Sequence, residues 1–171
     1  MTLQDLSNLA QVIGALAVVI SLFYVGFQIK RNTSAVRSAT AQAIHNNYGD
    51  WYMNLMCDAE LNRIGIKGLR DYSSLDEIEK ARFIDTFMAF ISFSQNAFYQ
   101  WREKALSPWL WGGWEILVMN LLAAPGGKEF WKERRYVFGK EYQEYVEKVI
   151  LTKKPHPEAR PFGAFKISDE R

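Results

Sequence analysis

The longest uninterrupted apolar stretch of the chain lies near its beginning, from Leu9 to Ile29, and contains no charged residue. As an α-helix, 21 residues at about 1.5 Å each extend roughly 31 Å, the thickness of the hydrocarbon core of a bilayer. Gln11 and Gln28 lie near its ends, and Tyr24 is suited to the headgroup region. The pattern predicts one transmembrane helix, and residues 1–31 are interpreted as a membrane anchor.

Two other structures explain an apolar N-terminal stretch. A signal peptide fits poorly because no Lys or Arg precedes the stretch, whereas Lys30 and Arg31 follow it where a cleavage site is expected. A fully buried helix of a soluble domain is the second alternative, and the length of the uncharged stretch disfavours it.

Charge asymmetry predicts the orientation of the anchor. Lys30, Arg31 and Arg37 follow the apolar stretch and only Asp5 precedes it, so the positive-inside rule places the rest of the chain in the cytoplasm. Since the predicted helix spans the membrane, the lipid bilayer is the first expected partner.

Small side chains recur along one face of the predicted span. Their spacing would let a second helix approach closely, which favours self-association or another membrane protein as a partner. Because Gly and Ala are common in any spanning helix, an ordinary composition explains them equally well. The residues of this helix-packing face are Ala10, Gly14, Ala17 and Ser21.

Helical periodicity continues after the anchor, and no strand pattern or repeat interrupts it. The spacing of Val36, Ala39, Ala43 and Tyr48 predicts that the first helix continues to a turn around Asp58. We expect a short helix over 60–69 and a loop at the DYSS sequence. A long helix over 75–104 follows, with Ser74 and Glu77 as its capping box, and its polar strip passes through Asp85, Ser92, Asn96 and Glu103.

Three more helices are predicted in the last third of the chain. Ser107 is a typical N-cap residue and Pro108 a typical first-turn residue, so they predict the start of a helix. This helix ends near Ala123, before the Pro-Gly-Gly sequence at 125–127. Helices over 128–138 and 140–151 follow. The predicted fold class is all-α, with one transmembrane helix continuing into a bundle of about five further helices. The helical domain spans 32–151 and an irregular tail spans 152–171.

Composition adds few constraints on function. The chain has 21 basic and 19 acidic residues, a net charge of +2, and the two signs are interleaved, so nucleic acid is not expected as a partner. The single cysteine, Cys57, has no partner for an internal disulfide. We interpret it as a small buried residue in a reducing compartment.

Several segments of the chain carry a recognisable pattern: residues 28–37 read QIKRNTSAVR, followed by LRDYSSLDEIEKARF, NAFYQWR, LWGGW, a Pro-Gly element and the segment from Phe138 to Val146. Together they resemble an uncharacterised family of small bacterial single-pass membrane proteins. The resemblance covers residues 9–150 and implies a bacterial inner-membrane protein, but no activity. Similar sequences often have Glu where this chain has Gln95.

No constellation of residues predicts an active site. The Glu-x-x-His pairs of di-iron bundles are absent, and the only histidines, His45 and His156, lie in distant segments. Cys57 has no evident base and no G-x-S-x-G turn occurs. We therefore predict no enzyme and no metal or cofactor; catalysis by His45 with carboxylates is the weakest alternative.

Two groups of side chains are candidate binding residues. The first is a possible pocket between the first and third helices, formed by His45, Asn96, Tyr99, Gln100 and Arg102, which alternatively only satisfy buried hydrogen bonds. The second is a group of tryptophans that form a possible interface, although core packing is favoured for most of them. These are Trp109, Trp111, Trp114 and Trp131.

These patterns favour a membrane-anchored helical interaction protein. It would act as a homo-oligomer or as an accessory subunit of a larger inner-membrane complex. The alternative is a sensor or binding module for an apolar small molecule or lipid.

Overall fold

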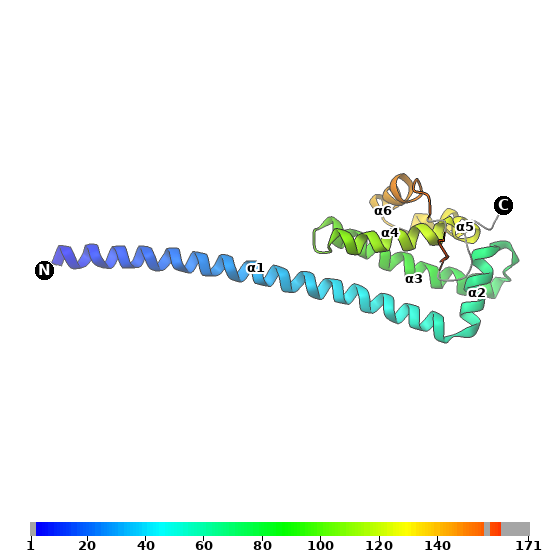
Figure 1. The fold of residues 1–171 in the computed structure, drawn as a ribbon, viewed down its shortest axis with the longest axis horizontal. Coiled ribbons are helices and arrows are strands. Elements are labelled where there is room, and N and C mark those ends of the chain that lie inside the picture. The colour runs from blue at the N-terminus through cyan, green and yellow to red at the C-terminus, as the bar shows by residue number, and fades with distance from the viewer. Residues whose placement is uncertain (1–2, 156–157, 162–171) are drawn as a thin grey trace. The chain divides into compact units, whose positions relative to one another are not determined.

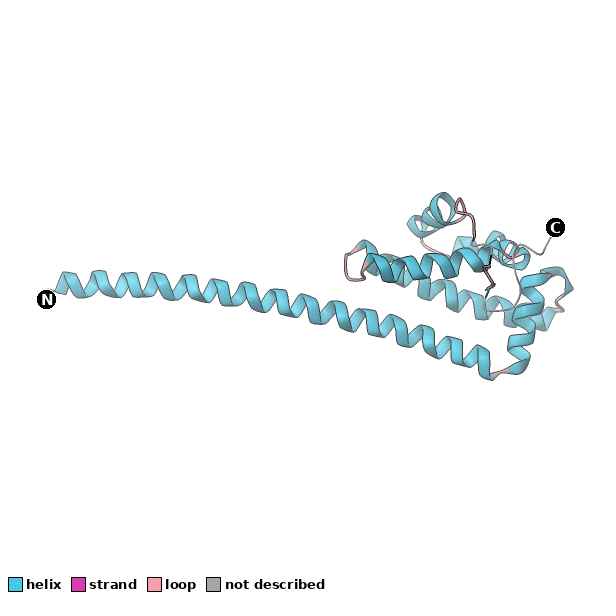
Figure 2. Ribbon diagram, in the orientation of Figure 1, coloured by secondary structure: helices cyan, strands magenta, loops and turns pink. Residues whose placement is uncertain are grey.

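The structure, a computed structural model, describes residues 3–155 and 158–161, and its helices are connected by short turns (Figure 1). No strand occurs among the described residues, so the predicted all-α class is confirmed (Figure 2). The chain divides into two compact units, Met1–Ala39 and Thr40–Arg171, and the first therefore extends beyond the predicted anchor.

Helix α1 (Leu3–Cys57) is continuous, as the sequence predicts. Its first part is long and apolar enough to cross a membrane, and none of its most apolar window is buried in the structure. In this respect it differs from a core helix of a soluble domain, whose apolar side chains are covered by neighbouring elements. The polar hydroxyl of Ser21 in this part donates to the Ala17 carbonyl oxygen at 2.8 Å, which satisfies it within the helix.

The turn at Asp58 is confirmed, because its side chain caps helix α2 (Ala59–Arg70) by accepting from the Leu61 amide at 2.9 Å. The buried face of α2 consists of Ile64, Gly65, Gly68 and Leu69. The DYSS sequence, predicted as a loop, contains a 3₁₀ turn (η1, Tyr72–Ser74).

Helix α3 (Glu77–Arg102) begins with a capping box, but not the predicted one. The Asp76 carboxylate accepts from the Glu79 amide at 2.8 Å, and the Asp76 amide donates to Glu79 Oε2 at 3.1 Å. Ser74 instead belongs to η1 and donates to the Asp71 carbonyl oxygen. Two overlapping sequences have the same spacing, and the short turn decides between them, so the predicted start was wrong by two residues. The polar strip of α3 is exposed, as predicted.

Helix α4 (Pro108–Ala123) has Ser107 at its N-cap and Pro108 in its first turn, although the serine side chain makes no capping bond. The Pro-Gly-Gly sequence was predicted to separate two helices, but it forms the first turn of helix α5 (Pro125–Arg134), so the predicted helix over 128–138 was wrong at both ends. Arg135–Val137 form a 3₁₀ turn (η2), and helix α6 (Lys140–Tyr145) continues into a π-helical turn (η3, Val146–Ile150), which together account for the last predicted helix.

The core of the second unit is aromatic and centres on α3, which packs against α2 and α4 (Figure 1). Phe83, Phe87, Phe90 and Phe98 of α3 are almost completely buried. Tyr142 of α6 is equally buried, and its hydroxyl donates to Ser94 Oγ at 2.8 Å. A polar group is tolerated in this core because it has a partner.

Candidate functional site

A groove with a volume of about 380 Å³ lies between α1 and α4 of the second unit. Its lining contains no Asp, Glu, Lys or Arg, and its polar side-chain groups are the His45 imidazole, the Tyr48 hydroxyl and the Trp114 indole N–H. Such a mostly apolar lining suits an apolar group. The lining consists of Ala41, Ile44, His45, Tyr48, Leu106, Leu110, Gly113, Trp114 and Leu117.

The lining of this groove contains only one of the five residues predicted to form a pocket. His45 is exposed and lies against α4 residues. Asn96 and Arg102 are exposed, whereas Tyr99 and Gln100 are half-buried, and none of these four lines the groove. The α3 residues thus lie apart from the groove that contains His45.

Gln95, one residue before this cluster, has a clear role that the sequence alone did not indicate. Its side-chain Oε1 accepts from the Gly139 amide at 2.7 Å, and Gly139 is the N-cap residue of α6. The bond ties the start of α6 to α3. A carboxylate oxygen would accept this bond as well as an amide oxygen does, so a Gln95→Glu substitution would keep the acceptor.

Of the four tryptophans considered as a possible interface, one is exposed and three are buried. Trp109 is 77% exposed, whereas Trp111, Trp114 and Trp131 are 2%, 8% and 5% exposed. The buried three pack in the core, the interpretation favoured for most of these side chains, and Trp111 also donates to the Tyr145 hydroxyl at 3.1 Å. Trp109 is the one of these four tryptophans that is accessible to a partner, and Ile116 of the same helix is exposed as well.

A second cavity, of about 450 Å³, lies between α4, α5 and the residues that follow η3. It differs from the α1–α4 groove because its lining contains two lysines and no acidic residue. Sequence reasoning missed it, since its wall comes from three segments that share no motif. The lining consists of Met119, Leu122, Ala123, Lys128, Trp131, Leu151, Lys153 and Pro155.

A hydrogen-bonded network lies beside this cavity. The Tyr145 hydroxyl donates to Glu115, and Lys153 Nζ donates to Glu115 Oε2 at 2.8 Å. Burial and the bond to Glu115 raise the pKa of Tyr145 to about 12. Burial opposes ionisation of Glu115, but the bonds from Lys153 and Tyr145 outweigh it and lower the pKa of Glu115. At neutral pH the pair is a neutral phenol and a carboxylate, which anchors the residues after η3.

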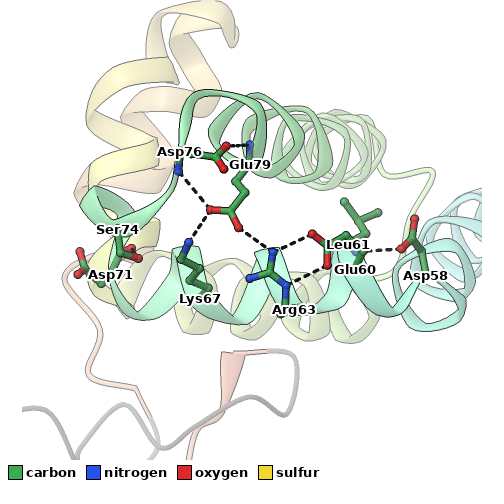
Figure 3. Close-up of polar contacts among 9 residues, drawn as sticks. All are labelled: Asp58, Glu60, Leu61, Arg63, Lys67, Asp71, Ser74, Asp76 and Glu79. Carbon is green, nitrogen blue, oxygen red and sulfur yellow. Dashed lines mark hydrogen bonds and ion pairs between the residues drawn. The ribbon is translucent and has the colours of Figure 1, made fainter.

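The densest set of charges joins α2 to α3 (Figure 3). The buried Glu79 accepts from Lys67 Nζ at 2.5 Å and from an Arg63 nitrogen at 2.7 Å. The bonds from Lys67 and Arg63, together with the Asp76 amide, lower the pKa of Glu79 to about 2. A carboxyl group that is ionised throughout the physiological range does not act as a general acid. The role of this cluster is to hold two helices together.

Other candidate groups are dispersed. Among the described residues, 3–155 and 158–161, no three His, Cys, Asp or Glu side chains are grouped so as to hold a metal ion. His156 lies outside the described residues. Cys57 is exposed at the end of α1, so its interpretation as a buried residue was wrong. The predicted packing face at Ala10, Gly14, Ala17 and Ser21 is exposed along its length.

No family model, curated protein or solved structure matches this chain.

Proposed function

We propose that the chain is a membrane-anchored helical interaction protein of the bacterial inner membrane. The anchor would hold the unit Thr40–Arg171 on the cytoplasmic side, where it acts as a homo-oligomer or as an accessory subunit of a larger membrane complex. The observation that carries the proposal is the uncharged stretch 10–29 of α1, in which every side chain is exposed.

Exposed apolar surface of this extent is unstable in water. Removing one methylene group from water stabilises a protein by about 0.8 kcal/mol. A helix with large apolar side chains on all faces is therefore stable only where lipid or protein shields these side chains from water. Val12, Ile13, Leu16 and Phe23 are each more than half exposed. A bilayer covers such a helix on every face, whereas one protein partner would cover a single face.

Two surfaces support interaction rather than anchoring alone. The small residues from Ala10 to Ser21 leave one face of the anchor open for a neighbouring helix. In the second unit, the exposed Trp109 lies one helical turn from Gly113, which lines the α1–α4 groove. Exposed aromatic side chains beside an uncharged groove are typical of protein interfaces.

Native mass measurement after extraction in a mild detergent tests this function. We expect a mass larger than one chain, and we expect Gly14→Ile to lower it, because a branched side chain would separate the packed helices. Gly26→Ile is the matched control: a Cβ at either glycine meets nothing within 4 Å, but Gly26 lies off the small-residue face.

Two results would contradict the proposal. One is a wild-type protein that is soluble after lysis without detergent. The other is a strict monomer that copurifies with no other protein.

A binding module for an apolar small molecule or lipid is the second candidate function. The two cavities of about 450 and 380 Å³ support it, because small-molecule sites in proteins are mostly apolar and measure about 300–1,000 Å³.

A further inference from the structure

We propose that the cavity between α4, α5 and residues 151–155 binds a single-chain amphiphile with an anionic head group, of which a fatty acid is the simplest example. The inference rests on the second candidate function and specifies its site and its ligand class. It does not depend on the oligomeric state of the protein.

The interior of the cavity suits an acyl chain. Met119 and Leu122 of α4 line one side, Leu151 lies on another, and the ring of Trp131 completes the wall. The Trp131 ring stacks on Phe138 with their centroids 5.7 Å apart and an angle of 9°, which fixes this wall in place. Each methylene group placed there would gain about 0.8 kcal/mol from leaving water.

The charges of the lining specify the other end of the ligand. Lys128 and Lys153 are both exposed, whereas Leu122 and Trp131 are buried, so the positive charge lies at the solvent side of an apolar interior. The lining contains no acidic residue, although Glu115 beside the cavity pairs with Lys153. An anion attached to a hydrocarbon chain matches both ends of this gradient, whereas a neutral apolar molecule or a free anion matches only one.

Both lysines retain donors for such a head group. Lys128 lies in the first turn of α5 and forms no ion pair with a described residue, and the positive end of the helix dipole adds to its attraction for an anion. Lys153 binds Glu115, but an ammonium group has three donors, so a second acceptor can be bound without breaking that pair.

Photocrosslinking of the full-length protein tests the site directly. The probe is dodecanoic acid with a terminal diazirine, added to the protein in nanodiscs of zwitterionic lipid. We expect crosslinks in peptides that contain Met119, Leu122 or Leu151, and Met119→Trp should abolish them by filling the cavity. Labelling confined to residues 9–29 would mean that the probe only dissolves in the bilayer, and would overturn the proposal.

Charge reversal supplies a matched pair of variants. Lys128→Glu should lower cavity labelling about tenfold or more, the usual contribution of one charge-assisted contact. Lys132→Glu makes the same charge change one turn away on α5, outside the lining, and should leave labelling unchanged. Because an acidic residue in the first turn stabilises a helix, loss of labelling in Lys128→Glu would not reflect unfolding. Equal labelling of the two variants would refute a role for the charge.

Two further experiments test the head group and the number of acyl chains of the ligand. The methyl ester of the probe should label the cavity weakly if the carboxylate is recognised. Because phosphatidylglycerol has two acyl chains, replacing part of the zwitterionic lipid with it should leave labelling unchanged; suppressed labelling would assign the cavity to an anionic phospholipid and overturn the single-chain ligand. A failure of all these arms with intact oligomers and membrane anchoring would remove the ligand but leave the interaction function standing.

Discussion

Gly126 controls how closely two helices of the second unit approach each other. It lies in the first turn of α5, and a Cβ added there would be 1.8 Å from the Gly68 carbonyl oxygen of α2. The obstacle is backbone rather than a flexible side chain, so the two helices would have to separate. The sequence suggested only that this glycine interrupts helices, because close contact between distant backbones leaves no local pattern.

Substitution of this residue should therefore destabilise the protein. We expect Gly126→Ala to lower the free energy of unfolding by about 1–3 kcal/mol, the usual cost of overpacking, measured by chemical denaturation in detergent. Gly113→Ala is the control, because a Cβ there meets nothing within 4 Å and alanine is the better helix former, so stability should rise by about 0.5–1 kcal/mol. A neutral Gly126→Ala variant would show that α2 and α5 are not in this close contact.

At the scale of the element, the start of α3 is held by charge as well as by capping. Glu79 takes part in the capping box with Asp76 and also accepts from Lys67 and Arg63 of α2. One side chain thus fixes both where α3 begins and which helix it contacts. Amphipathic spacing predicts neither contact, because Lys67 and Arg63 lie on α2 and Glu79 lies on α3, and their proximity depends on the turn between the two helices.

The pH dependence of stability should reveal this contact. The pKa of Glu79 is about 2 in the folded protein, compared with an ordinary value of 4.5, so its stabilising effect is fully present above pH 4.5 and is lost as the pH falls toward 2. We expect Glu79→Gln to be less stable than the wild type at neutral pH, and the difference to shrink between pH 4.5 and 2.

Glu77→Gln controls for this substitution, since it removes an exposed carboxylate from the same first turn of α3. Thermal unfolding of both variants across this pH range provides the measurement. A difference between Glu79→Gln and the wild type that stays constant down to pH 2 would contradict the assigned ion pairs.

The sequence predicted helices better than it predicted contacts between them. The continuity of α1, the turn at Asp58 and the polar strip of α3 all follow from local spacing, and all are confirmed. His45 was grouped with α3 residues because both segments were expected to be helical and adjacent, but it lies against α4 instead. The rotation of each helix about its axis is decided by aromatic packing between distant segments, which periodicity alone does not specify.

At the scale of the whole molecule, the two units have opposite surface chemistry. Through Ala39 the described side chains are exposed and largely apolar, whereas the unit Thr40–Arg171 buries its own aromatic core. For the membrane anchor that we propose, the basic residues Lys30, Arg31 and Arg37 after the apolar stretch predict that the second unit lies in the cytoplasm.

Cys57 provides a direct test of this orientation, because it is the only cysteine of the chain and is exposed in the second unit. We expect a membrane-impermeant maleimide to label it in inverted inner-membrane vesicles but not in intact spheroplasts, since the reagent would reach it only from the cytoplasmic face. Detergent-permeabilised spheroplasts control for reactivity, and a Cys57→Ser variant controls for specificity.

Labelling in intact spheroplasts would place the second unit outside the cytoplasm and refute the orientation. When wild-type labelling is confined to inverted vesicles, reversing the charges around the anchor tests what sets this orientation. If the basic residues set the topology, exchanging Lys30 and Arg31 for glutamine while adding two lysines before Leu9 should move Cys57 labelling from inverted vesicles to spheroplasts. Because these changes lie outside the aromatic core of the second unit, they should alter the side of labelling without altering the fold.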